Sequence, residues 1–156
     1  MNKLNVFLIG SFFAIGSLIT FNSCEKEGGC DENNISATGG NKSHNMGQNC
    51  MHCHVSGGEG EGCFTAAGSA YDSLQTSALH SGKIEFFTGP DGTGSLAHTI
   101  NIDNKGNFYT TASFEVNGLY PVLTAPSGQK KYMGSSLSSG QCSSCHGVST
   151  DKIWGN

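Results

Sequence analysis

Several residue types are scarce or missing in this 156-residue sequence. Arginine is absent: lysine supplies all eight basic residues against 12 acidic ones, and the formal net charge is −4. A nucleic-acid partner is therefore not expected, because phosphate binding needs a concentrated positive face. Only 13% of the residues are charged, and this low fraction, together with nine Phe and four Tyr, argues against an intrinsically disordered chain.

Familiar catalytic signatures are missing as well. The sequence contains neither a Ser-His-Asp pattern nor a glycine-rich phosphate loop, so we do not expect an enzyme. Its 23 glycines would be costly in helix interiors and exclude a long helical bundle. The length allows one domain with a single modest core. A small, mainly β protein is expected.

The first 23 residues have the form of a bacterial secretory signal. Lys3 precedes an apolar run over residues 4–21, which stops at Cys24. The segment resembles a lipoprotein signal peptide, which implies that residues 1–23 are removed and that Cys24 is lipidated. We then expect residues 24–43 to form a flexible tether to the cell envelope, on the periplasmic or the surface side of the outer membrane. A retained membrane helix and ordinary secretion without lipidation are the alternatives.

Four of the seven cysteines form two copies of the pattern Cys-x-x-Cys-His, which is the attachment signature of a c-type haem. Two thiols bond to one porphyrin, and the adjacent histidine binds its iron. The sequence therefore predicts two covalently attached haems, with attachment through Cys50, Cys53, Cys142 and Cys145 and with His54 and His146 as proximal iron ligands. A zinc site built from both pairs would not explain why His follows each pair, and a thioredoxin-like dithiol needs only one pair.

Two further cysteines, Cys30 and Cys63, remain once the haem cysteines and Cys24 are assigned. In an oxidising compartment these two thiols can pair with each other. Two unpaired thiols or an intermolecular bridge are the alternatives, because connectivity cannot be read from a sequence.

The 88 residues between the motifs are typical of short strands separated by turns. Residues 96–102 alternate, with Leu96, His98, Ile100 and Ile102 on one face, and a turn leads from them into the next strand. We expect strands at residues 66–72, 83–88, 96–102, 107–111, 119–124 and 130–133. They predict a small β-sandwich over about residues 64–133, set within a dihaem domain of residues 44–156 that has short helical or loop haem-binding segments at both chain ends.

The strand pattern also resembles a known family. A strand that contains Gly68, the run Ile-Asn-Ile-Asp-x-x-Gly-Asn-Phe-Tyr at residues 100–109, and Gly-Leu-Tyr-Pro-Val at residues 118–122 resemble the carboxypeptidase-regulatory-like, transthyretin-type β-sandwich. With a haem motif before and after it, the whole chain resembles the small dihaem cytochrome c lipoproteins of Bacteroidetes-type bacteria. This resemblance implies electron carriage. It implies as partners redox proteins or other multihaem cytochromes, and a membrane reached through the lipid anchor.

The distal ligand of each iron decides between a carrier and a catalyst. We favour His44, six residues before Cys50, and Met133, nine residues before Cys142, as the distal ligands. The other candidates are Met46, His52, His80 and His98. The leading expectation is an exported electron carrier. A haem enzyme or gas or peroxide sensor with one open iron, and a surface-binding β-sandwich with accessory haems, are the alternatives.

Overall fold

The computed structural model describes residues 29–156. The predicted signal segment and the lipidation site Cys24 lie outside the described residues. Within residues 29–156 no helix is long and apolar enough to cross a membrane.

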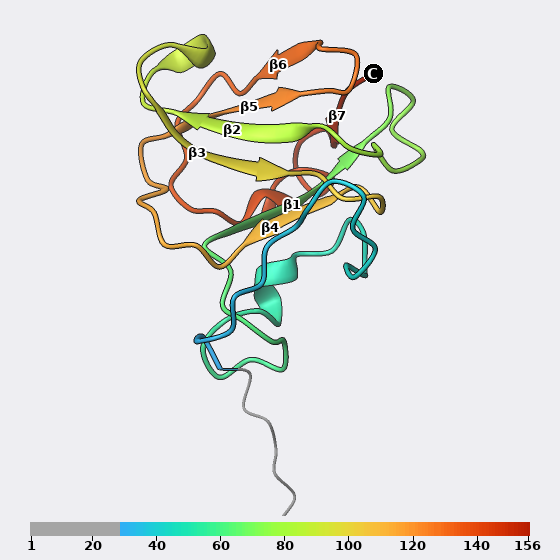
Figure 1. Ribbon diagram of the computed structural model, residues 1–156. Coiled ribbons are helices and arrows are strands. Elements are labelled where there is room, and N and C mark those ends of the chain that lie inside the picture. Colours follow the sequence, from blue (N-terminus) through green and yellow to red (C-terminus); the bar gives the residue numbers. More distant parts are fainter. Residues whose placement is uncertain (1–28) are drawn as a thin grey trace, which may run out of the picture.

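Two β-sheets make up the described chain (Figure 1). The smaller sheet has the order β4-β1-β7, with β1 antiparallel to β4 and parallel to β7. The larger sheet is antiparallel throughout and has the order β3-β2-β5-β6. The strands are β1 (Ala66–Tyr71), β2 (Lys83–Phe87), β3 (Leu96–Asn101), β4 (Asn107–Thr110), β5 (Tyr120–Thr124), β6 (Lys130–Tyr132) and β7 (Ile153–Trp154).

Both sheets contribute to one hydrophobic core. Strand side chains alternate between the two faces of a sheet, and the inward set of each sheet is apolar. The side chains of Phe86 and Phe108, from β2 and β4, are fully buried in this core. The remaining core strand residues are Ala66, Ala70, Ile84, Ile100 and Leu123. Two apolar sheet faces packed together in this way form a small β-sandwich, as the sequence predicts.

All six expected strands form, and each agrees with its predicted limits to within one residue at either end. The seventh strand, β7, was not expected. It contains only Ile153 and Trp154, too few residues for an alternating pattern to be recognised, and it forms because Ala70 and Tyr71 of β1 offer it an edge. The sandwich therefore extends past residue 133 and includes the C-terminal segment.

The segment expected to be a flexible tether packs against the sandwich from Ile35 onward. Ile35 forms an antiparallel bridge with Thr110, and the Ser36 backbone N–H donates to the Tyr109 carbonyl at 2.9 Å. The hydroxyl of Ser36, which is 2% exposed, donates to the Asn101 carbonyl at 2.6 Å. The expectation was wrong here because a polar composition does not reveal that β4 is an edge strand with unpaired backbone groups.

Candidate functional site

The first Cys-x-x-Cys-His segment is wound into one 3₁₀ turn, η1 (Cys50–His52). Asn49 caps this turn, since its side-chain oxygen accepts the Met51 N–H at 3.2 Å. The backbone N–H groups of Cys53 and His54 both donate to the Cys50 carbonyl, at 3.2 and 3.0 Å. Cys53 and His54 are thus held by the carbonyl of Cys50 at the end of the same turn that Cys50 begins.

The second segment repeats the same backbone pattern. Its turn is η3 (Cys142–Ser144), and the N–H groups of Cys145 and His146 both donate to the Cys142 carbonyl, at 3.3 and 3.0 Å. Two segments 92 residues apart in the chain thus adopt one local geometry, which their shared residue pattern explains.

Both motif histidines are held in the same way. Nδ1 of His54 lies 2.9 Å from the Glu61 carbonyl oxygen, and Nδ1 of His146 lies 2.8 Å from the Asp151 carbonyl oxygen. A backbone carbonyl can only accept, so each Nδ1 carries the proton and each Nε2 is the basic nitrogen. A histidine that ligates a metal through Nε2 is typically oriented by this kind of Nδ1–H hydrogen bond.

The four motif cysteines carry free thiols, whereas Cys30 and Cys63 are joined in a disulfide, the pairing that the sequence left open. Burial raises the pKa of the Cys50 thiol and raises that of Cys142 to about 12. Reactive dithiols have a thiol with a lowered pKa. The first cysteine of each motif therefore lacks the lowered thiol pKa of a redox-active nucleophile. This difference disfavours the dithiol interpretation.

The first motif lies against the outer face of the smaller sheet, below β1 and β4 in Figure 1. Cys50 and Met51 pack on a small apolar cluster that includes Phe64 and Tyr109. The ring of His54, which is buried, stacks on Phe64 with 4.1 Å between ring centroids. The centroid of the exposed His44 ring lies 5.9 Å from that of His54, and the two ring planes are tilted by 35°.

The second motif lies at the edge of the main core, where Cys142 is buried. Beside it is a cavity of about 580 Å³ whose lining is mainly apolar. Cys145 and His146 line the cavity together with Met133, a partly buried residue that packs on the core just after β6. Its other lining residues include Ile84, Phe108, Leu123, Leu137, Ile153, Trp154 and Lys131, whose ammonium group sits 2.8 Å from the Trp154 ring centroid.

Strand β1 separates the two motifs. Ala67 belongs to the outer cluster that contacts Cys50, whereas the neighbouring Gly68 faces inward, where an added Cβ would lie 2.9 Å from that of Cys142. The residues directly before the two motifs are in contact with each other. The Asn49 side-chain amide, before Cys50, donates to the side-chain oxygen of Gln141, before Cys142, at 3.0 Å. The motifs therefore approach one short strand from its two faces.

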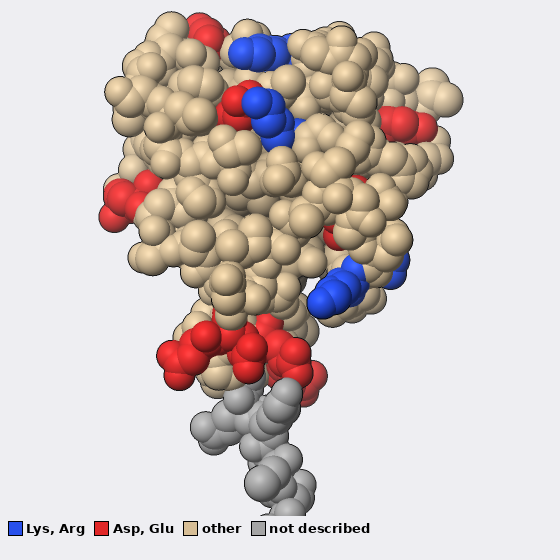
Figure 2. Space-filling view, viewed as in Figure 1, with Lys and Arg blue, Asp and Glu red and all other residues tan. Residues whose placement is uncertain are grey.

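The charge around the two motifs differs. The disulfide joins Cys30, which precedes Asp31 and Glu32, to Cys63, which follows Glu59 and Glu61. Figure 2 shows acidic side chains gathered at the end of the molecule where these segments lie. The acidic segment touches the first motif directly, because a Cβ at Gly60 would meet the His54 ring at 2.7 Å. The cavity at the second motif is instead lined by Lys131 and Lys152, with Asp151.

The remaining candidate ligands lie elsewhere in the fold. His98 stacks on Phe114 with 4.2 Å between ring centroids, and burial lowers its pKa. Nδ1 of His80 lies 2.6 Å from the Asn104 carbonyl oxygen.

The hydrogen bonds of the motif histidines to the carbonyls of Glu61 and Asp151 were not expected, because every residue type has a backbone carbonyl that can accept. In the described part of the chain, no three His, Cys, Asp or Glu side chains are grouped so that they could hold a metal ion.

Comparison with known proteins does not identify a family for this chain: no family model, no curated protein and no solved structure matches it.

Proposed function

We propose that this protein is an exported c-type cytochrome that binds two haems and carries single electrons in the cell envelope, held there by a lipid on Cys24. The observation that carries the proposal is the repetition of one geometry. In both Cys-x-x-Cys-His segments the thiols are free, the backbone forms the same turn, and the histidine Nδ1 is hydrogen-bonded to a carbonyl.

The residues present fit the group that the motif implies. A haem needs two thiols for its thioether bonds and one imidazole nitrogen for its iron, and each segment presents this donor set on one turn. The second segment also borders an apolar cavity large enough for a ligand of cofactor size. The zinc alternative fits less well, since four cysteines that reach β1 from its two faces cannot surround one ion.

Each residue has a defined part in the proposal. Cys50 and Cys53 attach the first haem, Cys142 and Cys145 attach the second, and His54 and His146 bind iron through Nε2. The carbonyls of Glu61 and Asp151 orient these imidazoles and increase their basicity. The haem supplies the chemistry, which is the one-electron change between ferric and ferrous iron. The chain supplies attachment, orientation and a β-sandwich that holds both sites close together.

A haem count tests the proposal. The full-length chain, matured in a host that attaches c-type haem, is expected to carry two covalent haems in a pyridine haemochrome assay and in intact mass. Replacing Cys50 and Cys53 with Ala, or Cys142 and Cys145 with Ala, should remove one haem each. The matched control, Cys30→Ser with Cys63→Ser, should retain both.

A chain with no covalent haem, or with bound zinc, would overturn the proposal. Adding carbon monoxide to the reduced protein separates the carrier from the alternative of a haem enzyme or sensor. A carrier with two six-coordinate irons keeps its spectrum, whereas an open iron binds carbon monoxide and shifts it.

A further inference from the structure

We infer that the two irons carry different sixth ligands, His44 at the first motif and Met133 at the second, and that the second haem is consequently the one that holds an electron more tightly. This inference rests on the proposed function and concerns how the two sites are made unequal. It follows from the side chains that lie beside each motif histidine and from the charges around them.

At the first motif the spacing of two imidazoles fits one iron. Imidazole–metal bonds of about 2 Å place the centroids of two trans imidazoles roughly 6 Å apart. The ring centroids of His44 and His54 are 5.9 Å apart. The two imidazoles are therefore close enough for both to bind one iron, with their ring planes tilted by 35°.

The chain holds His44 at this spacing through its backbone. The Asn107 side-chain amide donates to the His44 carbonyl at 3.2 Å and to the Ser43 hydroxyl at 3.0 Å. The Lys105 ammonium donates to the Ser43 carbonyl at 2.8 Å. Asn107 is itself 1% exposed, so its anchor is part of the folded sandwich. His44 is thus a side chain on a fixed backbone rather than on a loose loop.

At the second motif the available ligand is a thioether. His146 and Met133 are the histidine and the methionine that line the cavity. The Met133 backbone is fixed, because its N–H donates to the Pro121 carbonyl at 3.1 Å. Tyr132 is the other lining residue of a type that binds haem iron, but it is 48% exposed and packs beside Gly92.

Both differences act in the same direction. A Met ligand raises the reduction potential of a haem relative to a second His. Near the first motif the carboxylates of Asp31, Glu32 and Glu59 outnumber the ammonium group of Lys105 on the Ser43 carbonyl, and would stabilise the additional positive charge of ferric iron. At the cavity, Lys131 and Lys152 outnumber Asp151 and would favour the ferrous form. In a haem-loaded chain, dithionite would therefore donate its first electron to the iron bound by His146 and Met133 in preference to the iron bound by His54 and His44.

Near-infrared magnetic circular dichroism tests the inference on the holoprotein, since it distinguishes bis-imidazole from imidazole–thioether ligation of ferric haem. We expect one signal of each kind. During a stepwise reductive titration with dithionite, the thioether signal should disappear in the first half while the bis-imidazole signal persists.

Variants assign the ligands. Met133→Leu should abolish the thioether signal and leave an iron that binds carbon monoxide, whereas Met46→Leu, the matched control, should keep it. His44→Ala should abolish the bis-imidazole signal, and the control His80→Ala should not. The haem count of each variant shows that it is loaded, and far-ultraviolet circular dichroism shows that it is folded.

Specific results overturn the inference. Two bis-imidazole signals, a thioether signal that survives in Met133→Leu or is lost in Met46→Leu, or reduction of the bis-imidazole site first would each contradict it. A chain without haem is a different result, because it removes the proposed function itself.

Discussion

At the scale of single residues, Gly68 shows how little space separates the core from the second motif. A Cβ at this position would lie 2.6 Å from the Phe108 ring and 2.9 Å from the Cys142 Cβ. We expect Gly68→Ala to lower the free energy of unfolding by about 1–3 kcal/mol, because a packed core must shift to accept the methyl group.

Thermal or urea unfolding of the holoprotein measures this effect. Gly134→Ala is the matched control, since an added Cβ there has no neighbour within 4 Å and its backbone needs no left-handed conformation. Equal stability of the Gly68→Ala and Gly134→Ala variants would show that β1 yields more easily than the packing indicates.

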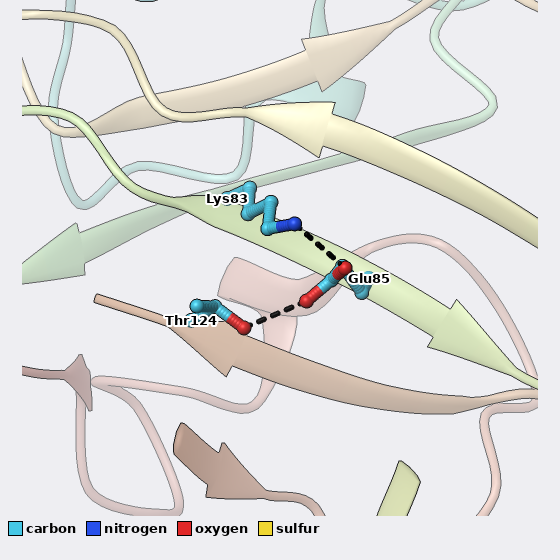
Figure 3. A network of polar contacts seen from close by, with 3 residues as sticks. All are labelled: Lys83, Glu85 and Thr124. Atoms are coloured by element: carbon cyan, nitrogen blue, oxygen red, sulfur yellow. Dashed lines mark hydrogen bonds and ion pairs between the residues drawn. The ribbon is translucent and has the colours of Figure 1, made fainter. Parts of the chain in front are cut away.

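Glu85 is a buried carboxylate on β2 with two partners (Figure 3). One oxygen lies 2.8 Å from the Lys83 ammonium, and the other accepts the Thr124 hydroxyl at 2.7 Å. Burial alone would raise the pKa of Glu85, but the hydrogen bonds and the positive charge of Lys83 outweigh it and lower the pKa below its ordinary value of 4.5.

A carboxyl group with a lowered pKa in the folded state stabilises the fold above its unfolded pKa. We therefore expect the contribution of Glu85 to be present at neutral pH and to be lost as the pH falls below 4.5 through the folded value. Glu85→Gln should cost about 1 kcal/mol at pH 7 and less in acid. Unfolding by urea at several pH values measures this difference, and an equal cost at every pH would contradict it. Thr124→Val is the control, because it removes one hydrogen bond to the carboxylate but keeps the Lys83 ion pair, so its cost should depend less on pH.

The sequence predicts the chemistry of the motif residues better than their surroundings. The Cys-x-x-Cys-His pattern itself identifies the two thiols and the imidazole, because it is the signature expected for covalent haem attachment. The Asn49–Gln141 hydrogen bond and the closeness of the His44 and His54 rings depend on how the folded chain brings these side chains together. No local pattern encodes such contacts.

At the scale of elements, the disulfide ties the segment before the first motif to the loop after it. Cys30 and Cys63 enclose a loop with a sequence separation of 33 residues, which contains the whole first motif. Closing a loop of this length stabilises a fold by about 3–4 kcal/mol through the unfolded chain.

We expect Cys30→Ser with Cys63→Ser to lower the free energy of unfolding by up to about 3 kcal/mol, while both haems remain attached. Calorimetry and a haem count on the same sample measure the two quantities. The matched comparison is the natural sequence with the Cys30–Cys63 disulfide intact and after its reduction by a thiol. An unchanged unfolding temperature would mean that the backbone contacts of Ile35 and Ser36 hold this segment without the bridge.

Strands were predictable where alternation or turn residues mark them, as in β3 and the turn that follows it. The elements that escaped prediction are short or polar. β7 has two residues, and the segment at Ile35 and Ser36 pairs through its backbone and the Ser36 hydroxyl. Tertiary pairing creates both of them, so composition could not indicate either.

At the scale of the whole molecule, the fluorescence of one tryptophan can report whether the second site holds a haem. Trp154 is its one tryptophan, and it lines the cavity beside the second motif. A haem in that cavity should quench the Trp154 emission by energy transfer. We expect the emission to rise several-fold in the variant with Ala at Cys142 and Cys145, and less in the variant with Ala at Cys50 and Cys53. Steady-state fluorescence at matched concentration measures it, and equal recovery in both variants would contradict the placement of the second haem.

The small side chains of β1 have a consequence for how this protein can vary. Residues 66–70 of β1 are Ala-Ala-Gly-Ser-Ala, so little more than the strand backbone separates the two motifs. Cys50 of the first motif and Cys142 of the second both pack against this strand. The span that an electron would tunnel is therefore determined by residues 66–70 and the turns that touch them. The connection between β2 and β3, residues 88–95, belongs to the other sheet and contributes no residue to the lining of the cavity. This connection could lengthen, shorten or acquire new surface residues while the distance between the two motifs stays unchanged.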